Sequence, residues 1–137
     1  MHEWSLAEAV VNTALGVMKE NGAEKINEMK VCVGELQQID LELFSSAIDS
    51  LSKGTPLDDA KKEICVEEAV LRCLNCKHEW KFKDALKDLR GEDAEAIHFV
   101  PELAHSYIRC PKCGSPDFEI VKGRGVWIEY IKVPMKK

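Results

Sequence analysis

The sequence predicts an α/β fold of the α+β kind, in which a small three-stranded sheet carries two helices and a four-cysteine segment is inserted before the last strand. Three observations lead to this prediction. Helical periodicity occurs twice in the first 54 residues, three segments have the character of strands, and four of the six cysteines form two closely spaced pairs. A chain of 137 residues with 45% apolar and 31% charged residues has the composition of a folded protein.

Composition and charge exclude several classes of protein. No apolar run approaches the roughly 18 residues of a membrane helix, and the early charges of Glu3 and Glu8 do not fit a signal peptide, so we expect a cytoplasmic protein without membrane contact. Residues 1–72 hold 7 Lys/Arg against 14 Asp/Glu, and residues 73–113 hold 7 against 7. Without a dense positive field, we expect no nucleic-acid partner.

The first predicted helix begins near Ser5. Ser5 and Glu8 have the spacing of a capping box, and Asn21-Gly22 is a typical helix end. Behind the cap, apolar residues recur at helical intervals: Leu6, Val10, Ala14 and Val17. This segment should pack one face on the rest of the protein.

A strand and a second helix follow. Met29, Val31 and Val33 alternate with less apolar residues, which is the period of a strand with one covered face. Asp40 is a suitable N-cap for a helix that Gly54 and Pro56 end. Its apolar stripe consists of Leu41, Phe44, Ile48 and Leu51.

Two further strands complete the predicted sheet. The segment 62–72 is read as one strand, in which the alternation changes phase near Glu67-Glu68, at a bulge. The run 125–133 is rich in β-branched and aromatic residues and is the last strand. We therefore expect residues 1–72 and 114–137 to form one domain.

Residues 73–113 form the second predicted domain. They contain a polar insert at about 81–107, with a short helix around 83–90. So few apolar residues cannot hold a domain together without a covalent or metal crosslink.

Two Cys-x2-Cys pairs supply such a crosslink. A tight turn with this spacing presents two thiolates to one ion. The four ligands are Cys73, Cys76, Cys110 and Cys113. Two disulfides would fit a reducing compartment poorly. A tetrathiolate suits Zn(II) or iron, and we favour Zn(II) in a structural role, because four protein ligands leave no open position. Cys32 and Cys65 have no such partner and are interpreted as buried free thiols.

The first residues form a second candidate metal site. The α-amine, the amide nitrogen of residue 2 and the His2 imidazole can close two adjacent chelate rings on one ion. Such a nitrogen set suits Ni(II) or Cu(II) better than Zn(II). Glu3 can add an oxygen ligand or orient His2.

In three features together, the chain resembles the HypA family of hydrogenase nickel-incorporation proteins. These are the Met1-His2-Glu3 start, the α-β-α-β order, and the C-x2-C…C-P-x-C-G-S segment before a final strand. The resemblance covers essentially the whole chain. It implies a nickel metallochaperone that works with a nickel-handling GTPase and delivers Ni(II) to the large-subunit precursor of a [NiFe]-hydrogenase. It also implies His2 as a nickel ligand, with Met1 and Glu3 beside it, and the four paired cysteines as zinc ligands.

The insert suggests one more nickel ligand. A three-nitrogen chelate leaves a position open, which His98 or His105 could fill; we prefer His98, beside Phe99 and Pro101. No nucleophile–base arrangement, phosphate loop or H-E-x-x-H motif is present, so we expect a carrier and not an enzyme. Two alternatives rest on the cysteines alone, a zinc-ribbon module in a nucleic-acid complex and a rubredoxin-like electron carrier.

Overall fold

The computed structural model describes residues 2–86, 100 and 108–134. Its elements in chain order are α1 (Glu3–Glu20), β1 (Glu28–Gly34), the 3-10 turn η1 (Glu35–Gln37), α2 (Leu41–Ser52), β2 (Lys61–Glu67), β3 (Val70–Cys73), β4 (Glu79–Lys81), α3 (Phe82–Leu86), β5 (Phe118–Lys122) and β6 (Val126–Lys132). The small α+β architecture predicted from the sequence is confirmed.

The chain divides into two compact units. The N-terminal unit comprises Met1–Cys32, Ile39–Cys65 and Val126–Lys137, and the cysteine unit comprises Val33–Gln38 and Val66–Gly125. The cysteine unit thus includes β3 and β5 in addition to the 73–113 segment delimited by the cysteines.

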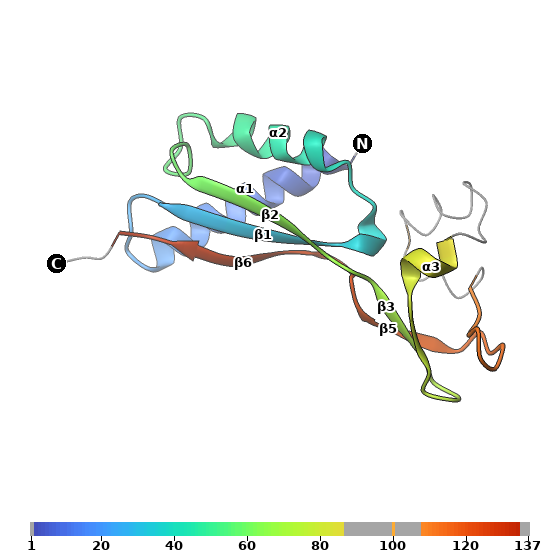
Figure 1. Ribbon diagram of the computed structural model, residues 1–137. Helices are drawn as coiled ribbons and strands as arrows, with labels where there is room; N and C mark the ends of the chain where they lie inside the picture. Colours follow the sequence, from blue (N-terminus) through green and yellow to red (C-terminus); the bar gives the residue numbers. More distant parts are fainter. Residues whose placement is uncertain (1, 87–99, 101–107, 135–137) are drawn as a thin grey trace. The chain divides into compact units, whose positions relative to one another are not determined.

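The N-terminal unit is a three-stranded sheet of order β2-β1-β6, with α1 and α2 packed on the same side of it (Figure 1). The alternation predicted for β1 is confirmed, since Met29, Val31 and Val33 are buried. Helix α1 contributes Ala7, Val10, Val11, Ala14 and Met18 to the core, and α2 contributes Phe44, Ala47 and Ile48. An apolar core therefore holds this unit together.

Helix α1 begins earlier than the sequence predicts. The first helical residue is Glu3 and the N-cap is His2, whose side chain makes no capping hydrogen bond. The capping box expected at Ser5 is wrong, because Ser5 is an exposed residue inside the helix. The earlier start is stabilised by a hydrogen bond from the N–H of Asp40 to the buried Glu3 carboxylate, which offsets the cost of burying this charge.

Helix α2 begins as predicted. Asp40 is its N-cap in an extended conformation, and the Asp40 carboxylate accepts the N–H of Leu43 at 3.1 Å. After Ser52 the chain turns at Gly54, where φ is +75°, a value that glycine adopts without steric cost. The same Asp40 residue thus connects the starts of both helices.

The segment 62–72 is two strands and not one. β2 belongs to the N-terminal sheet, whereas β3 lies in the second sheet, of order β4-β3-β5. Between them Ala69 is fully buried and its N–H donates to the Glu35 carboxylate at 2.8 Å. The phase change near Glu67-Glu68 therefore marks the passage between two sheets, and the predicted bulge inside one strand is a misinterpretation.

The cysteine unit has a small core of its own. β3 pairs antiparallel with β4 and β5, with a register irregularity between Val70 and Leu71. Its buried core residues are Leu36, Ala69, Leu71, Phe82, Ile108 and Phe118. Trp80 packs edge-on against Phe118 at 5.5 Å between ring centroids. The helix predicted around 83–90 is observed as α3 up to Leu86, and its remainder lies outside the described residues.

The interpretation of Cys32 and Cys65 as free thiols is wrong. The two residues form a disulfide between the neighbouring strands β1 and β2, with their Cα atoms 4.7 Å apart. This separation is within the range that a disulfide spans. No local sequence pattern indicates this bond, because the cysteines are 33 positions apart and meet only through the pairing of the two strands.

Gly34 permits a close approach of two backbone segments in the cysteine unit. Its N–H donates to the carbonyl of Gly125 at 2.7 Å, and a Cβ at position 34 would stand 2.3 Å from the carbonyl carbon of Gly123. Backbone atoms cannot move aside as a flexible side chain can, so any larger residue must displace a strand end.

We therefore predict that Gly34→Ala lowers the free energy of unfolding by about 2 kcal/mol or more. The matched control is Gly16→Ala in α1, where nothing lies within 4 Å of the added methyl group. Removing a helical glycine there should raise stability by about 0.5–1 kcal/mol. Denaturant unfolding of the zinc-loaded proteins measures both, and an equal effect of the two substitutions would contradict the close-approach argument.

Candidate metal centres

Four cysteines of the cysteine unit converge on one point. Cys73 ends β3, Cys76 lies in the turn that leads to β4, and the second pair lies in the turn before β5. The sulfur atoms of Cys73, Cys76, Cys110 and Cys113 all lie within 4.8 Å of one another. The two pairs that the sequence places 33 residues apart are thus brought together.

The separations fit a tetrahedral ion. The Sγ atoms of Cys73 and Cys113 are 3.5 Å apart, and those of Cys76 and Cys110 are 3.6 Å apart. Four sulfurs at about 2.3 Å from a central Zn(II) stand roughly 3.8 Å from each other. The donor set is therefore suited to a closed tetrathiolate site.

The two cysteine turns have the same backbone design. The N–H of Lys77 donates to the carbonyl of Cys73 at 3.0 Å, and the N–H of Gly114 donates to the carbonyl of Cys110 at 2.8 Å. Both turns end in the left-handed region, with φ of +67° at Lys77 and +76° at Gly114. Glycine adopts this conformation freely, whereas a lysine there costs about 1 kcal/mol.

Backbone and side-chain donors also point at the sulfurs. The N–H of Cys76 donates to Cys73 Sγ, and the N–H of Lys112 donates to Cys110 Sγ, both at 3.4 Å. The Asn75 amide is 3.6 Å from Cys113 Sγ. Asn75 was not singled out from the sequence, although its place between the cysteines of a pair is a usable signal.

The thiols of the cluster differ in their acidity. Hydrogen bonds from the Ser115 N–H and the Asn75 amide lower the pKa of Cys113 to about 6. A hydrogen bond from the His78 backbone acts in the same direction on Cys76, yet burial and the neighbouring thiols raise the pKa of Cys76 to about 11. Thiolates this close repel one another, so full ionisation of the cluster needs a cation among the sulfurs.

The second candidate centre is the first turn of α1. His2 is half-buried and its carbonyl accepts the N–H of Leu6 at 3.0 Å. Glu3 is only 5% exposed, and its Oε2 accepts the N–H of Asp40 at 3.0 Å. Two hydrogen bonds, to the N-terminal amine and to the Asp40 backbone, lower the pKa of Glu3 to about 2. The carboxylate therefore joins the start of α1 to the start of α2.

Of the other residues considered as nickel ligands, none falls in the described part of the chain. Met1, His98 and His105 lie outside the described residues. Asp40, which holds Glu3, was recognised from the sequence only as a helix cap. Its contact with Glu3 joins residues 37 positions apart and leaves no local signal.

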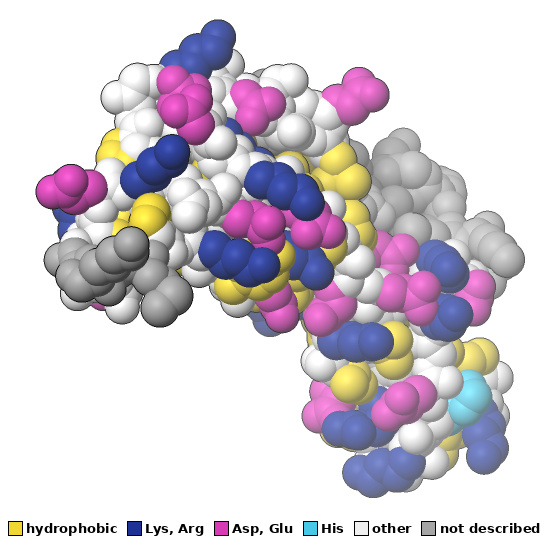
Figure 2. All heavy atoms as spheres, turned by 60° about the vertical axis from the view of Figure 1, so that its left-hand side comes forward, with side chains coloured by type: hydrophobic (Ala, Val, Ile, Leu, Met, Phe, Trp, Pro, Cys, Tyr) yellow, Lys and Arg dark blue, Asp and Glu magenta, His cyan; other side chains and the backbone are white. Residues whose placement is uncertain are grey.

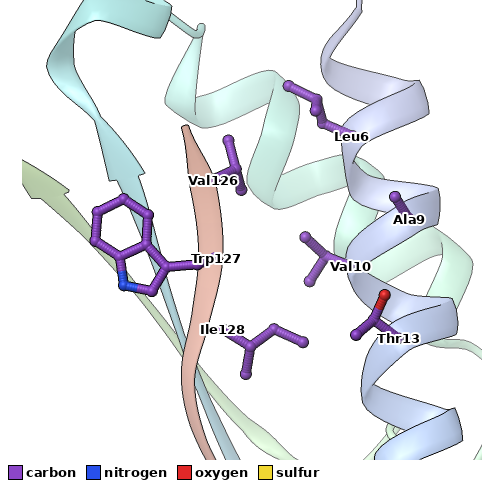
Figure 3. Close-up of a pocket in the computed structure, with 7 residues that line it drawn as sticks. All are labelled: Leu6, Ala9, Val10, Thr13, Val126, Trp127 and Ile128. Atoms are coloured by element: carbon purple, nitrogen blue, oxygen red, sulfur yellow. The ribbon is translucent and has the colours of Figure 1, made fainter. Parts of the chain in front are cut away.

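An apolar cleft of about 140 Å³ lies between α1 and β6 (Figure 3). Figure 3 shows Leu6, Val10 and Ile128 directed into the space between helix and strand. Its lining consists of Leu6, Ala9, Val10, Thr13, Val126, Trp127 and Ile128. None of these side chains is a carboxylate, thiol or imidazole, so the cleft is not a metal site.

The surface carries both signs of charge. On the face drawn in Figure 2, acidic and basic side chains are interspersed, in keeping with the formal net charge of −5. Among the described helices, none has the length and apolar character required to cross a membrane.

Comparison with known proteins decides the family. Residues 1–133 match the family described as hydrogenase/urease nickel incorporation, metallochaperone, HypA. The chain belongs to the HypA family. Hydrogenase maturation factors HypA from Pyrococcus abyssi and Thermococcus sibiricus are 49% and 44% identical over 133 residues, which cover 97% of this chain and 96% of each relative.

A solved HypA has the same fold. The solution structure of the Ni metallochaperone HypA from Helicobacter pylori covers 99% of this chain and 100% of its own, with 25% identity and a TM-score of 0.63. The resemblance noted from the sequence is thus confirmed, and the chain is a member of a nickel metallochaperone family of hydrogenase maturation, not an enzyme. That role implies contact with the maturation machinery.

The Glu3 contact predicts a pH dependence of the N-terminal unit. Because the pKa of Glu3 is lowered in the folded protein, its contribution is complete above the unfolded value of about 4.5 and is lost as the pH falls towards about 2. Glu3→Gln should remove about 2 kcal/mol at neutral pH and flatten this part of the profile. Hydrogen exchange of the α1 and α2 amides in nickel-free protein measures the stability of the N-terminal unit separately from that of the cysteine unit.

Glu8→Gln is the matched control, an exposed carboxylate on the same helix. It should leave the pH dependence of hydrogen exchange at the α1 amides the same as in the unaltered protein. Equal profiles for Glu3→Gln and the unaltered protein would show that the Asp40 contact contributes nothing.

Proposed function

We propose that this chain binds Ni(II) at its N-terminus and delivers it to the large-subunit precursor of a [NiFe]-hydrogenase, while a structural Zn(II) holds the cysteine unit. The observation that supports this best is the position of His2 and Glu3. They occupy the N-cap and first residue of α1, and Glu3 is tied to Asp40 on another helix. A terminus that usually frays is thereby anchored to the fold.

The proposed nickel donors are the α-amine, the residue-2 amide nitrogen and the His2 imidazole. The carbonyl of an N-cap residue accepts the first bond of the helix, but its amide nitrogen takes no part in the helical hydrogen bonds, so that nitrogen can bind a metal without breaking the helix. Planar nitrogen ligation favours Ni(II) over Zn(II). Glu3 then acts beside His2, with one oxygen held by the Asp40 N–H.

Release of the cargo requires an open or exchangeable position. His98 is proposed to occupy it, and a nickel-handling GTPase is the proposed partner in transfer. A chelate at the chain terminus exchanges ligands more readily than a closed cage of four thiolates. In this proposal the N-terminal centre transports nickel, and the four-cysteine centre has a structural role.

Zn(II) is proposed for the four-cysteine cluster. The sulfur separations agree with its coordination distance, and four protein ligands leave no position for a substrate. Bound there, the ion supplies charge compensation and crosslinks the turn after β3 to the turn before β5. No bond-breaking chemistry is assigned to it.

Blocking the terminus should abolish nickel binding. Acetylation of the α-amine removes one of three nitrogen donors, and His2→Ala removes another. We expect each to weaken Ni(II) binding by more than the roughly 100-fold that loss of an outer-sphere partner can cost. Nickel titration by calorimetry and absorption, with zinc content measured in parallel, should show one zinc retained in both proteins.

His98→Ala and His105→Ala form the matched pair for the fourth ligand. We expect about tenfold weaker binding and an altered absorption spectrum for His98→Ala, and no change for His105→Ala. Equal nickel affinity of the free and acetylated termini would contradict the proposed chelate.

Removal of zinc should unfold the cysteine unit alone. With Cys113→Ser, or with a chelator, we expect zinc loss and rapid hydrogen exchange in β3 and β5, because the buried apolar cluster in the described part of the unit is small. The amides of α1 should stay protected. Cys65→Ser is the control, a cysteine lost outside the cluster, and should keep one zinc per chain. Protection of β5 in zinc-free protein would refute a structural role for the ion.

A further inference from the structure

The disulfide between Cys32 and Cys65 joins sulfurs of unequal accessibility. Cys32 lies on the central strand β1 and is 5% exposed, whereas Cys65 lies on the edge strand β2 and is partly exposed. Thiol–disulfide exchange requires a thiolate to reach a sulfur atom. A reagent in solution therefore meets Cys65 first.

The two cysteines also stand at the limit of the N-terminal unit. Its first segment ends at Cys32 and its second segment ends at Cys65. β1 and β2 each continue two residues further, to Gly34 and Glu67. The disulfide thus ties two strands together at the last residues before each passes into the cysteine unit.

Glu129 on β6 favours the opposite, reduced state. Its Oε2 is 3.5 Å from Cys32 Sγ and also accepts the indole N–H of Trp127 at 3.0 Å. In the disulfide this sulfur has no proton to donate, whereas a Cys32 thiol would donate to the carboxylate. A purely structural disulfide would gain nothing from such a neighbour.

We propose that Cys32 and Cys65 form a reversible redox clamp, closed by low-molecular-weight disulfides and opened by low-molecular-weight thiols, that ties β1 to β2 where both strands leave the N-terminal unit. Glu129 is the positioning residue that holds the reduced form of Cys32. The clamp involves neither proposed metal centre and goes beyond the proposed nickel transport.

The chemistry balances as two exchanges. To close the clamp, the Cys65 thiolate attacks a small disulfide, forming a mixed disulfide and releasing one small thiolate. The Cys32 thiol then loses its proton to solvent, attacks the Cys65 sulfur and releases the second small thiolate. Overall, two protein thiols are oxidised and one small disulfide is reduced to two thiols. Opening reverses these steps, with attack on Cys65 Sγ and Cys32 as the leaving group.

The first test uses the full zinc-loaded chain in buffers of oxidised and reduced glutathione. Alkylation followed by peptide mass spectrometry reports the state of Cys32 and Cys65. We expect complete interconversion without unfolding, and amide exchange about tenfold slower or more at positions 33–36 in the oxidised protein. A disulfide that small thiols open only in denaturant, a pair that stays reduced, or equal exchange in both states would overturn the proposal.

The second test measures the thiol–disulfide equilibrium constant in Glu129→Gln. Loss of the charge-assisted bond to the Cys32 thiol should shift the constant about threefold to tenfold towards the disulfide. Glu20→Gln, an exposed residue of α1 with the same change in net charge, should leave it unchanged. Equal constants for Glu129→Gln and the control would remove Glu129 from the clamp.

The third measurement separates the roles of the two sulfurs. In Cys32→Ser, Cys65 should form a mixed disulfide with oxidised glutathione within minutes. In Cys65→Ser, the buried Cys32 should react at least about tenfold more slowly. The reverse order of reactivity in variants that circular dichroism finds folded would contradict the proposed mechanism.

Discussion

The convergence of four cysteine sulfurs is the constraint on which the cysteine unit depends. The sulfurs lie within 4.8 Å of each other, at the ends of two turns that are far apart in the sequence. Within the described part of the unit, the buried apolar cluster is small, with six members, so apolar burial contributes little to fixing the positions of β3, β4 and β5. Lys77, which follows the first cysteine pair, has a left-handed conformation that a lysine does not favour. A cation among the sulfurs would convert their mutual repulsion into the main attraction within the unit.

The N-terminal unit follows the opposite principle. Two helices cover one side of its sheet with apolar residues, and the unit needs no metal for its fold. One of its polar links lies at the start of the chain, where the Glu3 carboxylate accepts the N–H of Asp40. A flexible terminus cannot present a fixed set of donors, so this contact is what makes a terminal chelate physically reasonable. A closed thiolate cluster and an anchored open terminus thus meet different requirements within one small chain.

Several of the interactions described above lie at the ends of β1 and β2, where these strands leave the N-terminal unit. β1 ends at Gly34, which allows the close approach to Gly123, and β2 is followed by Ala69, which is bonded to Glu35. Cys32 and Cys65 lie just before these passages. The ends of β1 and β2 are therefore restrained twice, by backbone contacts within the cysteine unit and by a disulfide within the N-terminal unit.

The sequence by itself determined whatever depends on residues a few positions apart. The Cys-x2-Cys turns, the cap at Asp40 and the alternation of Met29, Val31 and Val33 are local patterns, and the structure confirms each as a local feature. Tertiary structure alone decided the start of α1, the division of 62–72 between two sheets, and the partners of Glu3, Cys32 and Cys65. Those outcomes rest on contacts between residues 33 to 37 positions apart or on which sheet a strand joins. The free energy of such contacts arises only when distant segments pack together, and no local pattern records it.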